Sequence, residues 1–311
     1  MIQPSQITPP MSTGRARDIA GTFDLRALPA DFLANPFPAY AALRESQPVR
    51  HMPDGSYFLT RHADLMAVYR DAATFSSDKH IEFAPKYGSD SPLYEHHTTS
   101  LVFNDPPLHT RVRKLIMGAL TRRAIADMEP GLVTLVDGLL DNIGEQGGGD
   151  LVEDFAAAIP VEIIGNLLGV PHADRGPLRD WSLAILGALE SVPTPELHLS
   201  AQRRAMRAAT VGGVELPEGA LVTLCIGAAN RDPDAFERPE SFDIRREGNR
   251  HLAFGFGIHQ CAGLSLARLE GRIAIGRFLQ RFPAYRLSAA PTRGGRARFR
   301  GFLKAPFVAQ G

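Results

Sequence analysis

The chain has 311 residues, of which 44% are hydrophobic and 22% charged, a composition able to bury a sizeable core. Lys plus Arg and Asp plus Glu each number 34, so the formal net charge is zero, which argues against a general nucleic-acid binder. Two cysteines cannot form a disulfide framework, no run of about 18 apolar residues occurs, and residues 1–21 lack the apolar core of a secretory signal. We therefore expect a cytoplasmic protein with neither membrane nor nucleic-acid partners.

The first third of the chain predicts short elements. Residues 1–22 show no apolar periodicity and are expected to form a flexible tail. Short helices are predicted at Pro38–Glu45 and Ala63–Ala72, and a hairpin at Val49–Thr60 around the turn sequence Pro53-Asp54-Gly55. Residues 75–104 have no clear period and are expected to form a long loop.

From residue 105 the apolar residues recur at the spacing of an amphipathic helix. Helices are predicted at Leu108–Leu120, Met128–Ile143, Phe155–Leu168 and Pro177–Leu189, and a last long helix from Gly263 to about Phe282. Short strands are favoured at 212–227 and 284–311, with an irregular coil at 230–246 between them. The fold class is mainly α with minor β, and residues 23–311 are expected to form a single domain.

One ten-residue segment carries most of the chemistry. Residues 254–263 read FGFGIHQCAG and lie directly before the last predicted helix. Free backbone N–H groups at a helix start stabilise a thiolate, and glycines at 255 and 257 let a loop bend tightly around the sulfur of Cys261. Gly263 allows a flat group to approach the helix start, Phe254 can shield one side of the sulfur, and His259 can reach an anionic group at the edge of that flat group.

This segment resembles the haem-ligand loop of the cytochrome P-450 family and matches its pattern at Phe254, Gly255, Gly257, His259, Cys261 and Gly263. The resemblance implies a P-450-like fold with haem b as cofactor and Cys261 as the proximal iron ligand, whose thiolate donation favours O–O bond cleavage. It also implies that one oxygen atom of O2 is inserted into a small organic substrate, with electrons from a ferredoxin-like donor and its reductase.

Other segments resemble the same family. Residues 228–243 resemble the meander before the ligand loop, and residues 104–113 resemble the start of its C helix. His109 and Arg113 are four residues apart, on one helical face, a spacing that suits two contacts to haem propionates. A further propionate arginine is expected before the Gly212-Gly213 turn; Arg203 fits by counting back, with Arg204 and Arg207 as rivals.

The chain also departs from the family pattern. It is shorter than the soluble bacterial members by roughly 90 to 100 residues, and the sequence passes near residues 199–203 from a likeness of the F helix directly to the strands beyond the K helix. No acid–alcohol pair of the I helix is found, so no catalytic residue is identified, and Glu247-x-x-Arg250 lies in the wrong place for the K-helix motif. Because haem needs apolar walls on both faces, the remaining helices are expected to expose apolar surface.

Two functions follow. The first is a haem-thiolate monooxygenase, and the alternative is a non-catalytic haem-binding remnant that lacks the oxygen-activation helix. A metal site at His80, Glu95, His96 and His97 is disfavoured because adjacent histidines do not converge on one metal ion. Cys225 lies in an apolar run and is expected in the core. Arg111, Lys114, Arg268 and Arg272 are either ordinary solvated residues or a docking face for an acidic electron donor.

Overall fold

The computed structural model describes residues 11–190, 201–293 and 301–309. The chain divides into two compact units. We call residues 10–118 and 193–262 the sheet unit, and residues 1–9, 119–192 and 263–311 the helical unit. Each unit has its own apolar core, and each is described by itself.

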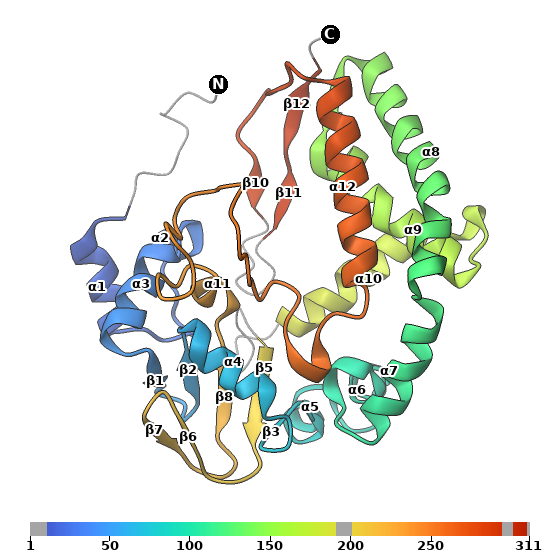
Figure 1. Ribbon diagram of the computed structural model, residues 1–311. Coiled ribbons are helices and arrows are strands. Elements are labelled where there is room, and N and C mark those ends of the chain that lie inside the picture. The colour runs from blue at the N-terminus through green and yellow to red at the C-terminus, as the bar shows by residue number, and fades with distance from the viewer. Residues whose placement is uncertain (1–10, 191–200, 294–300, 310–311) are drawn as a thin grey trace. The chain divides into compact units, whose positions relative to one another are not determined.

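The sheet unit is built on five strands in the order β1-β2-β8-β5-β3 (Figure 1). These are β1 (Val49–His51), β2 (Tyr57–Leu59), β8 (Leu221–Leu224), β5 (Ala201–Ala205) and β3 (Phe75–Ser76). β1 and β2 form the expected hairpin, with Val49 opposite Leu59 and Gly55 at a φ of 84° in the turn. β2 and β8 pair in parallel, whereas β5 pairs antiparallel with β8 and with β3. A second hairpin joins β6 (Ala209–Val211) to β7 (Val214–Leu216).

The helices of the sheet unit are α1 (Thr13–Gly21), α2 (Ala30–Ala34), α3 (Phe37–Ser46), α4 (His62–Arg70), α5 (His80–Tyr87), α6 (Pro92–Thr99), α7 (Leu108–Ala119) and α11 (Ile226–Ala229). Most of them bury apolar side chains, whereas α6 buries His97 and Thr98 and α7 buries His109. One core surrounds Leu59, Leu65 and Val222, and the other surrounds Tyr40 and Phe58. Cys225 is fully buried in this second core, as the sequence predicted.

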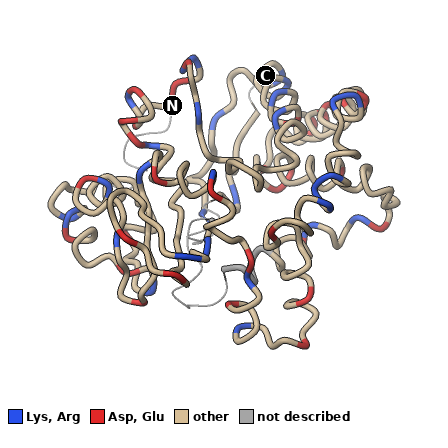
Figure 2. The backbone as a smooth tube through the Cα atoms, turned by 60° about the horizontal axis from the view of Figure 1, so that its bottom comes forward, with Lys and Arg blue, Asp and Glu red and all other residues tan. Residues whose placement is uncertain are grey.

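The helical unit consists mainly of α8 (Arg122–Gln146), α9 (Ala158–Leu168), α10 (Gly176–Glu190) and α12 (Leu264–Arg281). α8 and α12 lie side by side and bury Leu132, Val136 and Ile273 between them (Figure 1). β12 (Pro306–Val308) lies between β4 (Gly148–Asp150) and β9 (Arg286–Leu287), and β10 (Thr292–Arg293) pairs with β11 (Phe302–Lys304). A π-helical turn at Leu151–Ala156 leads into α9. Figure 2 shows that basic and acidic residues are mixed along the chain, in keeping with its zero net charge.

Two expectations from the sequence are wrong in detail. Thr13–Gly21 form helix α1, capped by the Ser12 side chain, where a loose tail was expected; residues 1–10 lie outside the described residues. The expected loop at residues 75–104 holds β3, α5 and α6. These helices are short, and aromatic packing rather than an apolar stripe holds them, since the rings of Phe83 and Phe103 are 5.0 Å apart.

The helical unit exposes large apolar side chains, as the sequence predicted. Leu168 of α9 is 68% exposed and Trp181 of α10 is 60% exposed. None of the α10 side chains that the structure describes is buried. A helix without a buried face gains little from packing, so α10 is weakly held by the residues that the structure describes. Within the described residues, no helix is long and apolar enough to cross a membrane.

Candidate haem-binding site

The loop before Cys261 is closed on itself. The Cys261 N–H donates to the Phe254 carbonyl at 2.8 Å, and Gly255 and Gly257 adopt φ angles of +66° and +70°. A side chain at either position would be strained because L-residues rarely adopt this conformation. At Gly257 the constraint is also steric, since a Cβ there would lie 2.4 Å from the carbonyl oxygen of Tyr69. The two glycines thus allow the tight loop that the motif requires.

The loop presents the thiol outward. Cys261 is a free, exposed cysteine, while the preceding Phe256 packs against the core of the sheet unit. The side-chain oxygen of Asn230 accepts a hydrogen bond of 2.7 Å from the Leu252 N–H, which holds the start of the loop. Phe254 is half-buried, with its ring 6.0 Å from that of His251. An anchored loop with an exposed sulfur is suited to bind a metal centre from one side.

Two histidines far apart in the sequence meet beside this loop. The rings of His109, on α7, and His259, in the 3₁₀ turn before Cys261, have centroids 4.3 Å apart. His109 is 2% exposed, and neither of its ring nitrogens has a hydrogen-bond partner of normal geometry; the same holds for Nε2 of His259. The pKa of His109 is lowered overall, because burial and the charge of Arg113 outweigh the opposing effects of Asp105 and the Ile258 backbone. Buried nitrogens without partners of normal geometry are costly, and a ligand with acceptor atoms would satisfy them.

Arg203 adds a buried positive charge to the same place. Its side chain leaves β5, is 7% exposed, and donates from Nη1 to its neighbour's carbonyl, that of Gln202, at 2.8 Å. No carboxylate of the described residues lies within ion-pair distance of it. Burial lowers the pKa of Arg203, and burial together with Arg203, His109 and Arg113 lowers the pKa of His259 to about 3. The charges of Arg203 and Arg113 and the ring of His109 thus all act on His259, whose ring lies 4.3 Å from that of His109.

Asp105 is the nearest acid to this cluster, but it is already engaged. Its carboxylate accepts hydrogen bonds from the Ser76 hydroxyl and from the Ser77 N–H, the latter at 2.9 Å. The cluster of Arg203, Arg113 and two neutral imidazoles therefore has donors and positive charge without a matching anion. A haem propionate is an anion with hydrogen-bond acceptors, and the donor set fits it.

The structure separates the three candidate arginines. Arg204 points to the other side of β5 and pairs with Glu82 at 2.8 Å, and Arg207 donates to the Thr74 hydroxyl at 3.0 Å. Only Arg203 of the three is coupled to both histidines. Gly263 belongs to the helical unit, where it is the N-cap residue of α12.

Sequence reasoning missed Tyr69, which touches the glycine loop through its backbone and so has no motif of its own. It also missed a buried ion cluster in which Glu82 contacts Lys79 at 3.3 Å as well as Arg204. Burial lowers the pKa of Lys79 to about 8. The described residues contain no group of three or more potential metal ligands.

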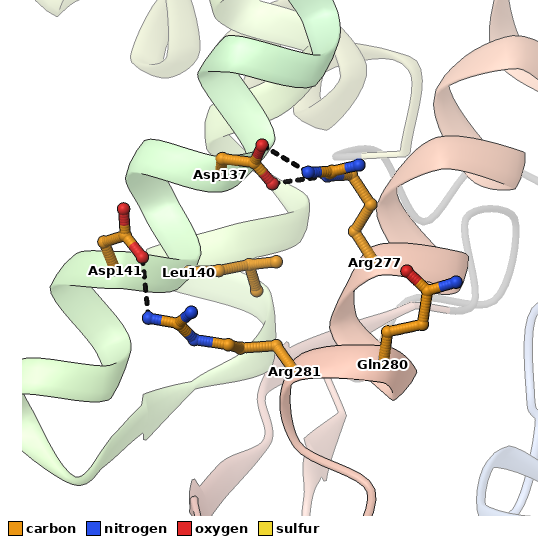
Figure 3. Close-up of a pocket in the computed structure, with 6 residues that line it drawn as sticks. All are labelled: Asp137, Leu140, Asp141, Arg277, Gln280 and Arg281. Carbon is orange, nitrogen blue, oxygen red and sulfur yellow. Dashed lines mark hydrogen bonds and ion pairs between the residues drawn. The ribbon is translucent and has the colours of Figure 1, made fainter.

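A separate pocket of about 390 Å³ lies on the helical unit between α8 and α12 (Figure 3). Asp137 and Asp141 on α8 face Arg277 and Arg281 on α12, and Leu140 lies between the two pairs. The charges of this pocket pair with one another across the helices and so join α8 to α12.

Comparison with known proteins finds relatives that align with most of the chain. The family model described as Cytochrome P-450 matches residues 194–293. Vitamin D(3) 25-hydroxylase of Pseudonocardia autotrophica is 30% identical over 360 aligned positions, which cover 83% of this chain and 89% of that protein. 6-Deoxyerythronolide B hydroxylase of Saccharopolyspora erythraea is 26% identical, with 80% and 89% covered.

Solved structures agree on the fold. The structure of CalO2 superposes with a TM-score of 0.80 at 22% identity, covering 93% of this chain and 98% of that one. The hydroxylase HmtN gives a TM-score of 0.75 at 23% identity, with 91% and 97% covered.

The alignment to the Pseudonocardia protein also shows how much shorter this chain is. The alignment has 360 positions and includes 83% of this 311-residue chain, which is about 258 residues. About 100 positions are therefore occupied only in the relative. The internal shortening expected from the sequence is therefore plain in the comparison as well.

Proposed function

Because the chain belongs to the cytochrome P-450 family of monooxygenases, we propose that it binds haem b with the Cys261 thiolate as the proximal iron ligand. The observation that carries this proposal is the pair of imidazoles, His109 and His259, whose buried nitrogens lack hydrogen-bond partners of normal geometry, beside Arg203 and the exposed Cys261 loop. A lone cysteine would not distinguish this site from an ordinary surface thiol. The nearby cluster of buried hydrogen-bond donors without a matching anion makes that distinction.

Each residue then has a defined task. The bound haem supplies the activation of O2 for insertion of one oxygen atom into an organic substrate. Cys261 donates its thiolate sulfur, held outward by the Gly255 and Gly257 turn. His109, Arg113 and His259 donate hydrogen bonds to propionate oxygens, and Arg203 supplies the buried positive charge.

Two further residues complete the proposed site. Phe254 shields the Cys261 sulfur from water. Gly263, which has no side chain, leaves room for the porphyrin ring at the start of α12.

We propose a ferredoxin-like donor with its reductase as the source of electrons and a small organic molecule as substrate. Arg111 and Lys114 are exposed on α7 and make no ion pair with any described residue, which suits an acidic donor. Arg272 pairs with Glu129 at 2.9 Å and is less suited. The α5–α6 segment, by resemblance, covers the substrate side. We also propose that the protein acts in the cytoplasm.

The internal shortening of the chain limits the monooxygenase activity that we propose. We propose that the missing positions fall between α10 and β5, near residues 199–203, a stretch that lies partly outside the described residues, and that residues 23–311 otherwise form one P-450-like domain. The exposure of Trp181 and Leu168 supports a missing apolar neighbour. It equally favours the second candidate function, a haem-binding remnant without oxygen-activating machinery.

The test is a spectrum of the purified 311-residue chain supplied with haem. A thiolate-ligated protein gives the red-shifted Soret band of a ferrous–CO complex, whereas a chain without this ligand gives the band of free or imidazole-bound haem. Absence of the red-shifted band after reconstitution would refute the proposal. The two candidate functions are then separated by whether electron consumption yields a hydroxylated product.

A further inference from the structure

Tyr69, at the end of α4, lies against the Cys261 loop. Its carbonyl oxygen lies 2.4 Å from where a Cβ of Gly257 would stand, so the two backbones are in direct contact. Its hydroxyl oxygen lies 4.0 Å from where a Cβ of Gly255 would stand, so the side chain is close to the second glycine as well. The residue is 5% exposed and belongs to the same core as Leu252, just before the loop. Tyr69 therefore packs against the bend of the Cys261 loop.

The same ring lies under the buried arginine. The guanidinium carbon of Arg203 is 5.6 Å from the centroid of the Tyr69 ring, within the range of a cation–π contact. Burial raises the pKa of Tyr69, and the charge of Arg203 opposes that rise. Arg203 has no carboxylate within ion-pair distance among the described residues, so its buried charge is favoured by the Gln202 carbonyl, by Tyr69 and by Asp105.

These contacts come from three separate parts of the sequence. α4 provides Tyr69, β5 provides Arg203, and the loop before α12 provides Gly255 and Gly257. We propose that Tyr69 is a positioning residue that fixes Arg203 relative to the Cys261 loop, so that the thiolate and the propionate-binding charge are held at one spacing. This inference rests on the proposed haem site and adds to it a residue outside the ligand-loop motif.

The ring, the hydroxyl and the backbone of Tyr69 have separable roles. Every substitution keeps the backbone contact with Gly257. Tyr69→Phe keeps the aromatic face and removes the hydroxyl, whereas Tyr69→Leu keeps bulk in the core and removes the face. Tyr57→Leu is the matched control, since Tyr57 is a buried tyrosine of the same core whose ring packs against His51 instead. Loss of a tyrosine from this core is thus separated from loss of the contact with Arg203.

The first measurement is the rate at which reconstituted protein loses haem to an excess of a haem-scavenging apoprotein. We expect Tyr69→Leu to speed haem loss about 5- to 10-fold, the size of a partly desolvated cation–π contact, and Tyr69→Phe to stay within about 2-fold of the original chain. Tyr57→Leu should leave the rate unchanged. In an Arg203→Gln background, Tyr69→Leu should have no further effect. An equal effect of Tyr69→Leu in both backgrounds, or none in the original chain, would overturn the proposal.

The second measurement needs no haem. If the Tyr69 ring holds the guanidinium of Arg203, removal of the ring should loosen the Arg203 side chain. We expect the NMR order parameter of the Arg203 Nε–H group to fall in Tyr69→Leu and to stay unchanged in Tyr69→Phe and Tyr57→Leu. If the original chain binds no haem, the proposed function fails, and this measurement still decides the role of Tyr69. An unchanged Arg203 order parameter in Tyr69→Leu would show that Tyr69 does not hold Arg203 in place.

Discussion

The ring centroids of His109 and His259 lie 4.3 Å apart, although the two residues come from different segments of the sheet unit. Each has at least one buried nitrogen without a hydrogen-bond partner. Two neutral imidazoles gain little from this proximity by themselves. The arrangement becomes favourable when an anion with several acceptor atoms joins them, and it is this relationship that the predictions below test.

The thiol that binds iron should be Cys261 alone. Cys261→Ala should abolish the red-shifted ferrous–CO band because no other exposed thiol is present to replace it. Cys225→Ala should retain the band, since Cys225 is fully buried and burial raises the pKa of its thiol to about 11. An intact band in the Cys261→Ala protein would remove the basis of the assignment.

The propionate contacts should each contribute to haem retention. His109→Ala, Arg113→Ala and His259→Ala should each cost about 1.5 to 3 kcal/mol of haem binding, the worth of one charge-assisted contact, without abolishing it. The measurement is the rate of haem transfer to a scavenger. Arg207→Gln is the control, because Arg207 bonds to Thr74 instead. Retention equal to the original chain in all three alanine variants would mean that the propionates are held elsewhere.

Acid should weaken the haem-free fold through His259. Its pKa is about 3 in the folded chain and about 6.5 in an unfolded one. Between these values the unfolded state binds more protons, so the free energy of unfolding falls as the pH drops from about 6.5 towards about 3. His259→Gln should flatten this dependence in urea titrations at several pH values, by less than the full shift implies because the ring is only part-buried. An unchanged slope in the variant would contradict the burial of a neutral imidazole.

Catalysis by the 311-residue chain should be poorly coupled. The sequence has no counterpart of the acid–alcohol pair that relays protons in the family, and a positioned proton donor is worth about 10²- to 10⁴-fold in rate. With a reductase and ferredoxin supplied, consumption of the electron donor should exceed hydroxylated product, with hydrogen peroxide as the main product of reduction. Tightly coupled hydroxylation would show that another segment or a second copy of the chain completes the substrate side.

The ligand loop could be predicted from sequence because its constraints are local. Gly255 and Gly257 need positive φ angles, and Cys261 and His259 have fixed spacings from them, so a short window holds the whole pattern. The pairing of His109 with His259 could be expected only through the family resemblance, since nothing in either segment points to the other. The geometry of a short loop can be predicted from its own residues, whereas a contact between distant segments depends on the core that brings them together.

The choice among Arg203, Arg204 and Arg207 shows where sequence reasoning stops. Alternate residues of a strand point to opposite faces, so a shift of one residue exchanges the buried and outer arginines. The register of β5 is fixed by its pairing with β8, in which Arg203 lies opposite Val222. That pairing is long-range, so residues 201–207 by themselves do not indicate the register. α5 and α6 were missed for a similar reason, as aromatic packing replaces the apolar stripe that periodicity detects.

The contrast between the two cysteines has a practical consequence. A thiol-reactive dye added to the haem-free chain should attach once per molecule, at Cys261, because Cys225 is enclosed and protonated at neutral pH. Bound haem would occupy the same sulfur and block the label. Dye stoichiometry thereby counts empty molecules in any preparation, and air oxidation of unfilled protein should join two chains sulfur to sulfur into a covalent dimer that a reductant reverses.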